Sequence, residues 1–360
     1  MDDKKHVVLV TGAAGYVGGM LVRKFAARDD VAKVIGLDKE PLPDFIKDVP
    51  NLVYLEKNTA DDWEDEVAKH APDIVIHAAW QIREIYGDRP LSWKWNIDGS
   101  DRVFEYAFSR AAVSRLVYFS TVASYGSFSE NSVDHFFTED EPFRKSEYLY
   151  AEEKRVAEEH LLERYDKRAN RNLQVSVVRP AAITGPRGRF MRIRFGLQAA
   201  LSGTLKGQKS FIYNVISLLV AWVPVTEKWL RQFIHEDDVV GIVERLAFGD
   251  PVPGLEIFNI CPPGPAIRGK DMARAVGKRS FPIHPLLVRI GYFFFWHLSR
   301  GKVPTAPGAW RGYCYPIAVD GSKVTRVLGY HYAYGGYDAF YYTNGEYEDA
   351  VPEKMRRHKP

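Results

Sequence analysis

The sequence predicts an α/β protein with a doubly wound parallel sheet of the Rossmann type and a smaller C-terminal substrate lobe. Two observations support this fold class. Short apolar, β-branched segments alternate with helical patterns through the first half of the 360-residue chain, which is typical of a parallel sheet with helices on both faces. A glycine-rich turn joins the first of these segments to the first helical pattern.

The expected elements of the first half follow the chain in order. Strands are predicted at residues 6–11, 33–37, 52–55, 73–78, 114–120 and 173–179. Helices are predicted at residues 15–28, 61–70, 93–111 and 147–165. Ligands bind such sheets beyond the carboxyl ends of the strands, so residues that follow a strand are candidates for the site.

The first turn carries glycine at three spaced positions. Gly12 permits a tight turn, Gly15 lets the backbone approach a pyrophosphate, and Gly18 lets the helix pack closely on the strand. The helix start then offers backbone N–H groups and a partial positive charge to phosphates. The pattern predicts a dinucleotide-binding turn. Its expected cofactor contacts are Gly12, Ala14, Gly15, Tyr16, Val17 and Gly18.

An acidic residue ends the second predicted strand. Asp38 lies 20 residues beyond Gly18, where a carboxylate accepts hydrogen bonds from the adenosine ribose hydroxyls. A carboxylate there repels a 2′-phosphate, so NAD is the expected cofactor. The adjacent Lys39 is a cation that tolerates the phosphate, so the sequence also allows NADP.

The alternation weakens after residue 180, where Pro and Gly become frequent and aromatic residues cluster. We therefore expect an NAD-binding Rossmann domain over residues 1–180, to which 231–260 returns. A substrate-binding lobe is expected from residues 181–230 and 261–345. The last residues, 346–360, are expected to form a basic tail that frays at its end.

Composition excludes several classes of protein. A net charge of +3 with scattered basic residues gives no sign of nucleic-acid binding. Two cysteines are too few for a disulfide framework or a cysteine-rich metal site, so no metal is expected. The charged N-terminus leads directly into the first strand without a secretory signal, so a cytoplasmic location is expected.

Two apolar stretches, residues 211–223 and 286–298, are shorter than the roughly 20 residues of a membrane span. One interpretation is a buried helix or a contact between lobes. The alternative is an apolar wall for a lipophilic substrate, or a surface that makes peripheral contact with a membrane.

Tyr150 and Lys154 are spaced so that they share one face of a helix. An ammonium group near a phenol stabilises the phenolate and lowers its pKa, which makes tyrosine usable as a general acid or base. Thr121 follows the strand predicted at 114–120, so its hydroxyl lies at the ligand edge of the sheet. There it can hydrogen-bond the substrate oxygen whose proton the tyrosine transfers.

Together these motifs resemble the extended short-chain dehydrogenases/reductases of the NAD-dependent epimerase/dehydratase family. The resemblance covers nearly the whole chain and is strongest over residues 6–186 and 231–260. It rests on Thr11 to Gly18, Asp38, His77-Ala78-Ala79, Asn96, Thr121 with Tyr125-Gly126, Tyr150 with Lys154, and Arg179-Pro180 with Gly185-Pro186.

The resemblance implies an enzyme that transfers a hydride at a carbon bearing a hydroxyl or ketone. Thr121 and Tyr150 would be catalytic, and Lys154 would hold the nicotinamide ribose and tune Tyr150. Relatives often dimerise, so a homodimer is expected. Further cofactor contacts are implied at Lys39, Asn58, Thr59, Ala78, Ala79, Trp80, Asn96, Pro180 and Ile183.

Two of these positions are open to interpretation. The family often has Asp plus an apolar residue near adenine, where this chain has Asn58 and Thr59; an Asn carbonyl can still accept from the adenine amino group. Asn96 is interpreted either as a cap at a helix start or as support for the active site.

Three chemistries compete. A nucleotide-sugar epimerase is favoured by Arg231, which matches a position where such enzymes bind the substrate diphosphate. A 4,6-dehydratase is disfavoured because Val122-Ala123 stand where those relatives carry an Asp-Glu pair. A hydroxysteroid-dehydrogenase-like enzyme for lipophilic alcohols or ketones is favoured by Ala182, where many nucleotide-sugar members have asparagine. The expected substrate contacts are Thr121, Ala181, Ala182 and Arg231.

A fourth hypothesis is a non-catalytic dinucleotide-binding protein. Members of this fold that lost catalysis lack the tyrosine or lysine, whereas Thr121, Tyr150 and Lys154 are all present here. The substrate itself is not identified by the sequence.

Overall fold

A seven-stranded sheet dominates the first of two units in the computed structural model, which describes residues 5–191 and 222–359. This unit comprises Met1–Thr121, Glu153–Arg179 and Val240–Phe258. The strand order is β11-β6-β5-β4-β1-β2-β3, and the six strands β1 to β6 pair in parallel. The strands are β1 (His6–Thr11), β2 (Val31–Asp38), β3 (Leu52–Glu56), β4 (Ile74–His77), β5 (Arg115–Phe119), β6 (Gln174–Pro180) and β11 (Leu255–Ile260). The predicted doubly wound fold is confirmed.

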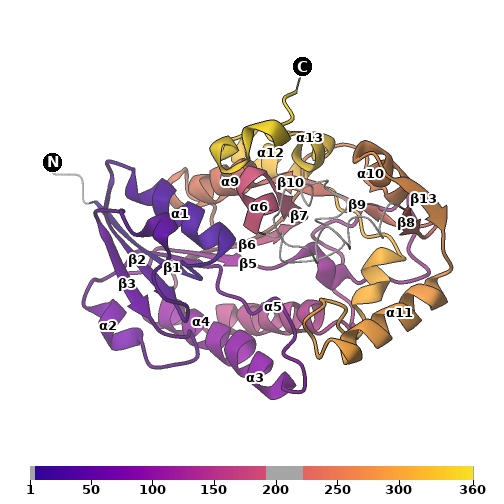
Figure 1. The fold of residues 1–360 in the computed structure, drawn as a ribbon. Helices are drawn as coiled ribbons and strands as arrows, with labels where there is room; N and C mark the ends of the chain where they lie inside the picture. Colours follow the sequence, from indigo (N-terminus) through magenta and orange to yellow (C-terminus); the bar gives the residue numbers. More distant parts are fainter. Residues whose placement is uncertain (1–4, 192–221, 360) are drawn as a thin grey trace. The chain divides into compact units, whose positions relative to one another are not determined.

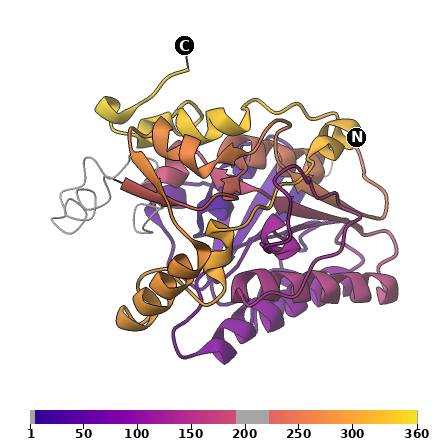
Figure 2. The same ribbon diagram turned by 90° about the vertical axis from the view of Figure 1, so that its right-hand side faces the viewer.

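Helices cover both faces of this sheet (Figure 1 and Figure 2). On one face α1 packs against α9, where the Phe25 and Phe248 rings lie 5.1 Å apart and Arg28 pairs with Glu244. On the other face α4 lies beside α5, and His160 hydrogen-bonds Asp101 at 3.0 Å. These helices are α1 (Tyr16–Ala26), α9 (Glu236–Phe248), α4 (Gly99–Ser109) and α5 (Leu149–Lys167).

The helix predicted over 93–111 begins earlier and is interrupted. Its first turns form α3 (Arg89–Trp93), a π-helical turn η2 (Lys94–Asp98) follows, and α4 completes it. Asp88 caps α3 by accepting from the backbone N–H of Leu91 at 3.0 Å, and Pro90 occupies the first turn. These start signals lie upstream of the apolar periodicity, which explains the late predicted start. The helix predicted over 61–70 is the shorter α2 (Glu64–Ala68).

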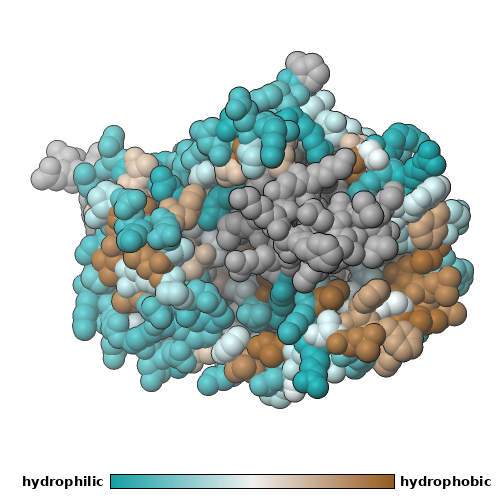
Figure 3. Space-filling model, viewed as in Figure 1, coloured by the Kyte–Doolittle hydropathy of each residue, from teal (hydrophilic) through white to brown (hydrophobic). Residues whose placement is uncertain are grey.

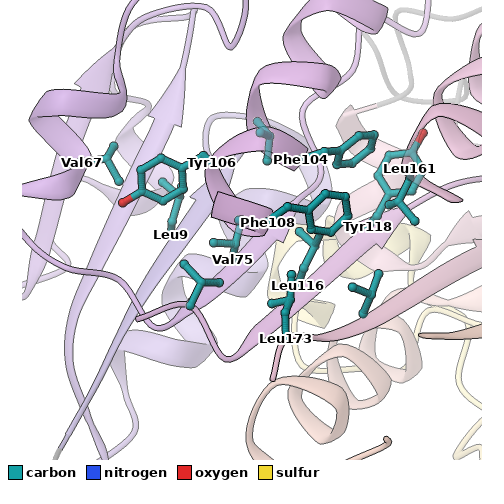
Figure 4. Close-up of a cluster of buried hydrophobic side chains, with 14 of the residues drawn as sticks. Leu9, Val67, Val75, Phe104, Tyr106, Phe108, Leu116, Tyr118, Leu161 and Leu173 are labelled. Atoms are coloured by element: carbon teal, nitrogen blue, oxygen red, sulfur yellow. The ribbon is translucent and has the colours of Figure 1, made fainter. Parts of the chain in front are cut away.

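One core cluster of the first unit forms between the sheet and the layer that holds α4 and α5 (Figure 4). Leu9, Val75 and Leu116 come from adjacent strands, and Phe104 and Leu161 come from the two helices; all are completely buried. Burial of each such side chain contributes roughly 1.5–3 kcal/mol. This packing fixes the strand ends from which the candidate site is built.

The second unit comprises Val122–Glu152, Pro180–Val239 and Asn259–Pro360 and contains small sheets and short helices. Its strand pairs are β7 (Ala182–Thr184) with β10 (Phe233–His235), β9 (Leu230–Arg231) with β12 (Ile267–Arg268), and β8 (Trp222–Val225) with β13 (Arg279–Pro282). Among the described residues, its helical segments are η3 (Val122–Tyr125), α6 (Pro186–Met191), α10 (Gly269–Ala275), α11 (Pro285–Leu298), η5 (Ala309–Tyr313), α12 (Ser322–Leu328), α13 (Gly336–Tyr341), η6 (Glu348–Ala350) and η7 (Glu353–Met355). Trp229, Phe233 and Met272 belong to its core.

Two expectations about this unit are wrong. The tail expected to fray is held in place, because the Arg357 N–H donates to the Thr343 hydroxyl at 2.7 Å and the Thr343 N–H donates to the Arg357 carbonyl at 2.9 Å. Residues 286–298 form α11, which is not a buried helix, since most of its apolar side chains are exposed. The other apolar stretch, 211–223, lies outside the described residues except for its last two.

Candidate functional site

The glycine turn between β1 and α1 has no room for side chains at two of its positions. Gly12 adopts a φ of +76°, and a Cβ there would lie 2.6 Å from the Ala79 nitrogen. A Cβ on Gly18 would lie 2.0 Å from the Gly12 carbonyl oxygen. The Gly15 N–H closes the turn by donating to Gly12 at 2.9 Å. The structure therefore brings the turn, the start of α1 and the predicted Ala78–Ala79 segment together in a form that suits a pyrophosphate.

Asp38 ends β2 and faces the same turn. Its carboxylate accepts from the Ala14 N–H at 2.9 Å and from the Glu40 N–H at 3.0 Å. Burial raises the pKa of this carboxyl, and the two backbone donors oppose that rise. Lys39 forms an ion pair with Glu40. The carboxylate thus faces the glycine turn, and the neighbouring cation is engaged by another acid.

Asn58 and Thr59 follow β3 and are held by local contacts. The Asn58 side-chain oxygen accepts from the Ala60 N–H at 2.9 Å. Thr59 is buried, and a Cβ on Gly99 would lie 2.4 Å from its hydroxyl oxygen. Any adenine contact of Asn58 would therefore use the second lone pair of an oxygen that already closes a turn.

Asn96 lies inside η2 and is buried, so the interpretation as a helix-start cap is wrong. Its side-chain oxygen accepts from the Gln81 N–H at 2.7 Å, and its amide donates to the Gln81 carbonyl at 3.1 Å. The same amide donates to the Glu153 carboxylate at 2.6 Å. Asn96 therefore ties the segment after β4 to α5, the helix that also carries Lys154.

Lys154 is buried at the carboxyl end of β5. Its ammonium donates to the Phe119 carbonyl and lies 3.5 Å from the centre of the Trp80 ring. Burial lowers the pKa of Lys154 well below its usual value, and the Glu158 and Glu153 carboxylates counteract this shift. Thr121, also buried, follows two residues after Phe119. The structure thus brings Lys154 to the strand end from which Thr121 continues.

Tyr150 lies one turn before Lys154 on α5. This first turn of the helix belongs to the second unit. The Tyr148 ring lies beside it, with 5.7 Å between the ring centres. The start of this helix is tied to η3, because the Ser124 hydroxyl donates to the Ala151 carbonyl at 2.9 Å. The Tyr-Lys spacing predicted from the sequence therefore lies on one continuous helix.

Two acidic side chains of α5 were not anticipated. Glu153 is buried, and burial raises its pKa to about 7 although Asn96 donates to it. Glu158 forms a buried ion pair with Arg179 at the end of β6. Their burial could not be predicted from the sequence. The helix α5 is polar on most of its surface, so residue spacing does not show which of its side chains face the interior.

Of the predicted substrate residues, Thr121 ends a segment of the first unit, whereas Ala181, Ala182 and Arg231 lie in the second unit with the predicted cofactor contacts Pro180 and Ile183. The Ala181 N–H donates to the Ile260 carbonyl at 3.1 Å, and Ala182 starts β7, in which Ile183 pairs with Ile234. Pro180 ends β6. Arg231 ends β9, and its guanidinium lies 5.1 Å from the Tyr313 ring centre. No carboxylate among the described residues forms an ion pair with Arg231.

A family model now identifies the class of this α/β protein. The model of the NAD-dependent epimerase/dehydratase family matches residues 8–261, and the chain belongs to this family. The predicted family is confirmed, and the predicted NAD cofactor agrees with it. Across residues 5–191 and 222–359, no helix combines the length and apolar character needed to cross a membrane.

Solved structures support the same fold. UDP-glucose 4-epimerase of Thermotoga maritima, solved with UDP-glucose, is similar with a TM-score of 0.66 at 20% identity, covering 93% of this chain and 96% of that chain. The dTDP-glucose 4,6-dehydratase of Bacillus anthracis, solved with NAD, gives a TM-score of 0.67 at 18% identity and covers 98% of both chains.

Curated relatives match a smaller share of this chain than the solved structures do. An uncharacterized protein of Methanocaldococcus jannaschii is 29% identical over 166 residues, which are 42% of this chain and 49% of the relative. This match thus spans about half the length of that relative. An uncharacterized protein of Mycobacterium tuberculosis is 25% identical over 280 residues, covering 77% of this chain and 67% of the relative.

Proposed function

We propose that this protein is an NAD-dependent epimerase acting on a nucleotide sugar. The observation that carries the proposal is the buried Lys154 at the end of β5, one helical turn from Tyr150. Burying an ammonium costs desolvation free energy, and a protein that only bound the dinucleotide would gain nothing in return. The glycine turn supports the cofactor, because a Cβ at Gly12 or Gly18 would fill the space between the turn and its neighbours.

In the proposed reaction, Tyr150 takes the proton of a sugar hydroxyl and later returns it. The Lys154 ammonium stabilises the phenolate form of Tyr150, and the Thr121 hydroxyl hydrogen-bonds the reacting oxygen. A bound NAD would supply the hydride chemistry at the sugar carbon, first as acceptor and then as donor. Gly12, Gly15 and Gly18 would hold its pyrophosphate, and Asp38 would accept from its adenosine ribose.

A nucleotide sugar is favoured over a lipophilic alcohol by one observation. Arg231 forms no ion pair with a carboxylate among the described residues, which leaves its guanidinium available for a diphosphate. Ala182 still favours the alternative, a hydroxysteroid-dehydrogenase-like enzyme, because alanine cannot hydrogen-bond a diphosphate.

The first test is to denature the purified protein and quantify the NAD(H) that it releases. An epimerase recycles its hydride internally, so we expect near-stoichiometric NAD(H) and interconversion of UDP- or dTDP-sugars. An empty protein that exchanges NAD(H) reversibly and oxidises lipophilic alcohols would overturn the proposal in favour of the alternative. Tyr150→Phe should lower turnover by at least about 100-fold while leaving NAD binding intact. Tyr148→Phe is the matched control and should keep turnover.

A further inference from the structure

The apolar residues of α11 form an exposed surface on the second unit. Leu286, Leu287, Ile290, Phe293, Phe294 and Leu298 recur at the spacing of one helix face. All are exposed, from 43% for Ile290 to 81% for Leu298. We call these six residues the α11 apolar face. In Figure 3 brown side chains gather at the lower right, where Figure 1 draws α11.

The opposite side of α11 is anchored to its own unit. Tyr292 is partly buried, with its ring centre 5.5 Å from that of Tyr313, and Trp296 is only 5% exposed. His284 caps the helix by accepting from the Leu286 N–H at 3.2 Å. The helix is therefore held in one orientation, and its apolar face points outward from a packed base.

The stretch of chain that contains this face carries charge of one sign. No Asp or Glu occurs between Asp271 and Asp320, whereas this segment contains seven Lys and Arg residues. Arg289 within the helix and Arg300 and Lys302 just beyond it are all exposed. An exposed apolar helix face whose flanking sequence carries cations and no acids is the pattern of a helix that lies in the interface of an anionic bilayer.

We infer that the α11 apolar face docks on a membrane surface that contains anionic lipids. The helix has 14 residues, too few to span a bilayer, so it would lie in the plane of the membrane. A second copy of this chain is the competing occupant. In a symmetric dimer the same face would meet itself and bring like charges together, whereas anionic headgroups complement these cations. This inference does not depend on the proposed reaction.

The test is flotation of the full-length protein with vesicles of phosphatidylcholine, with and without phosphatidylserine. We expect binding only to the vesicles that contain phosphatidylserine, and a decline as salt is raised. Phe293→Ser with Phe294→Ser should reduce the bound fraction by at least about tenfold, since two aromatic anchors are lost. Arg300→Gln and Lys302→Gln should each weaken binding about fivefold at low salt.

Two controls separate docking from unfolding and from self-association. Val327→Ser changes an exposed apolar residue of α12 and should leave vesicle binding unchanged. All variants should keep the wild-type melting temperature, because the changed side chains are exposed. Absence of binding to anionic vesicles overturns the inference. The inference is also overturned if the protein binds no vesicles and forms a dimer that the serine variants dissociate. That result would assign the face to a second copy of the chain.

Discussion

At the residue scale, Lys154 shows how an ammonium can be kept in the interior. It donates to the Phe119 carbonyl and lies over the Trp80 ring, a contact that favours a desolvated cation. The Glu158 and Glu153 carboxylates lie close enough to raise its pKa against the effect of burial. The charge of Lys154 therefore depends on acidic residues of its own helix.

Glu153→Gln tests this dependence. Glutamine keeps an oxygen that can accept from Asn96 but removes the negative charge, so the pKa of Lys154 falls further and the Tyr150 phenolate loses support. We expect the acidic limb of the kcat/KM profile for epimerisation to move up by about one pH unit. The measurement is kcat/KM against pH with the sugar nucleotide that supports turnover.

Glu159→Gln is the matched control for this change. It lies on the same helix, where its exposed carboxylate pairs with Arg155, and its profile should match the wild type. An unshifted profile for Glu153→Gln would show that Glu153 only packs beside Lys154.

Arg231→Gln addresses the proposed diphosphate contact. Loss of a charged hydrogen-bond donor to phosphate should raise the KM for a UDP- or dTDP-sugar by about 10- to 100-fold and leave NAD affinity unchanged. Arg268→Gln, an exposed residue of the partner strand β12, is the control for net charge. Unchanged KM in Arg231→Gln would argue against a role for this residue in substrate binding.

At the scale of elements, the β1–α1 turn works because it excludes side chains. Gly18 sits in the first turns of α1, and a Cβ there would meet the Gly12 carbonyl oxygen. The Gly12 backbone in turn lies against Ala78 and Ala79. Because Gly12 and Gly18 carry no Cβ, the helix start, the turn and the segment after β4 can pack in close backbone contact.

Gly18→Ala should disturb this fit. The added methyl must push α1 away from the turn, which we expect to destabilise the protein by about 1–3 kcal/mol and to abolish measurable NAD binding. Thermal unfolding and calorimetric titration with NAD give the two quantities. Gly291→Ala in α11 is the control, because its Cβ meets nothing within 4 Å; it should raise stability by about 1 kcal/mol and keep NAD affinity. Wild-type NAD affinity in Gly18→Ala would refute the argument.

Prediction from sequence succeeded where a local pattern decides the structure. The strands β1 to β6 match their predicted ranges closely, because a buried parallel strand is a short apolar run bounded by turns. It failed where tertiary contacts decide. Nothing in the sequence marks the bonds of Asn96 to Gln81 and Glu153, and apolar composition alone gave no means to distinguish the exposed α11 from a buried helix.

At the scale of the whole molecule, buried titratable groups make the free energy of unfolding depend on pH, and different groups act in opposite directions. Burial raises the pKa values of Glu153 and Asp237 to about 7. Their folded forms bind protons more readily than the unfolded chain, so they favour folding as the pH falls from about 7 toward their unfolded values. His77 acts in the opposite direction, since burial lowers its pKa to about 3.

The contacts of His77 explain its neutral state. One ring nitrogen lies 2.7 Å from the Thr11 hydroxyl, and the other lies 2.9 Å from the Ser100 hydroxyl. The Ser100 hydroxyl itself donates to the Asn96 carbonyl. A neutral imidazole that accepts from Thr11 and donates to Ser100 completes this chain, whereas a protonated ring would present a second N–H to Thr11.

His77→Gln isolates the contribution of this histidine. In the wild type, the unfolded chain gains a proton on His77 below about pH 6.5 while the folded chain does not, so stability falls as the pH drops. Between about pH 7 and pH 5 this contribution amounts to about 2 kcal/mol. The variant is expected to be less stable at neutral pH, because it loses the imidazole packing against Tyr118. Its unfolding free energy should nevertheless decline less on acidification than that of the wild type, as measured by urea unfolding at both pH values. Equal declines in the two proteins would mean that His77 is protonated in the folded state.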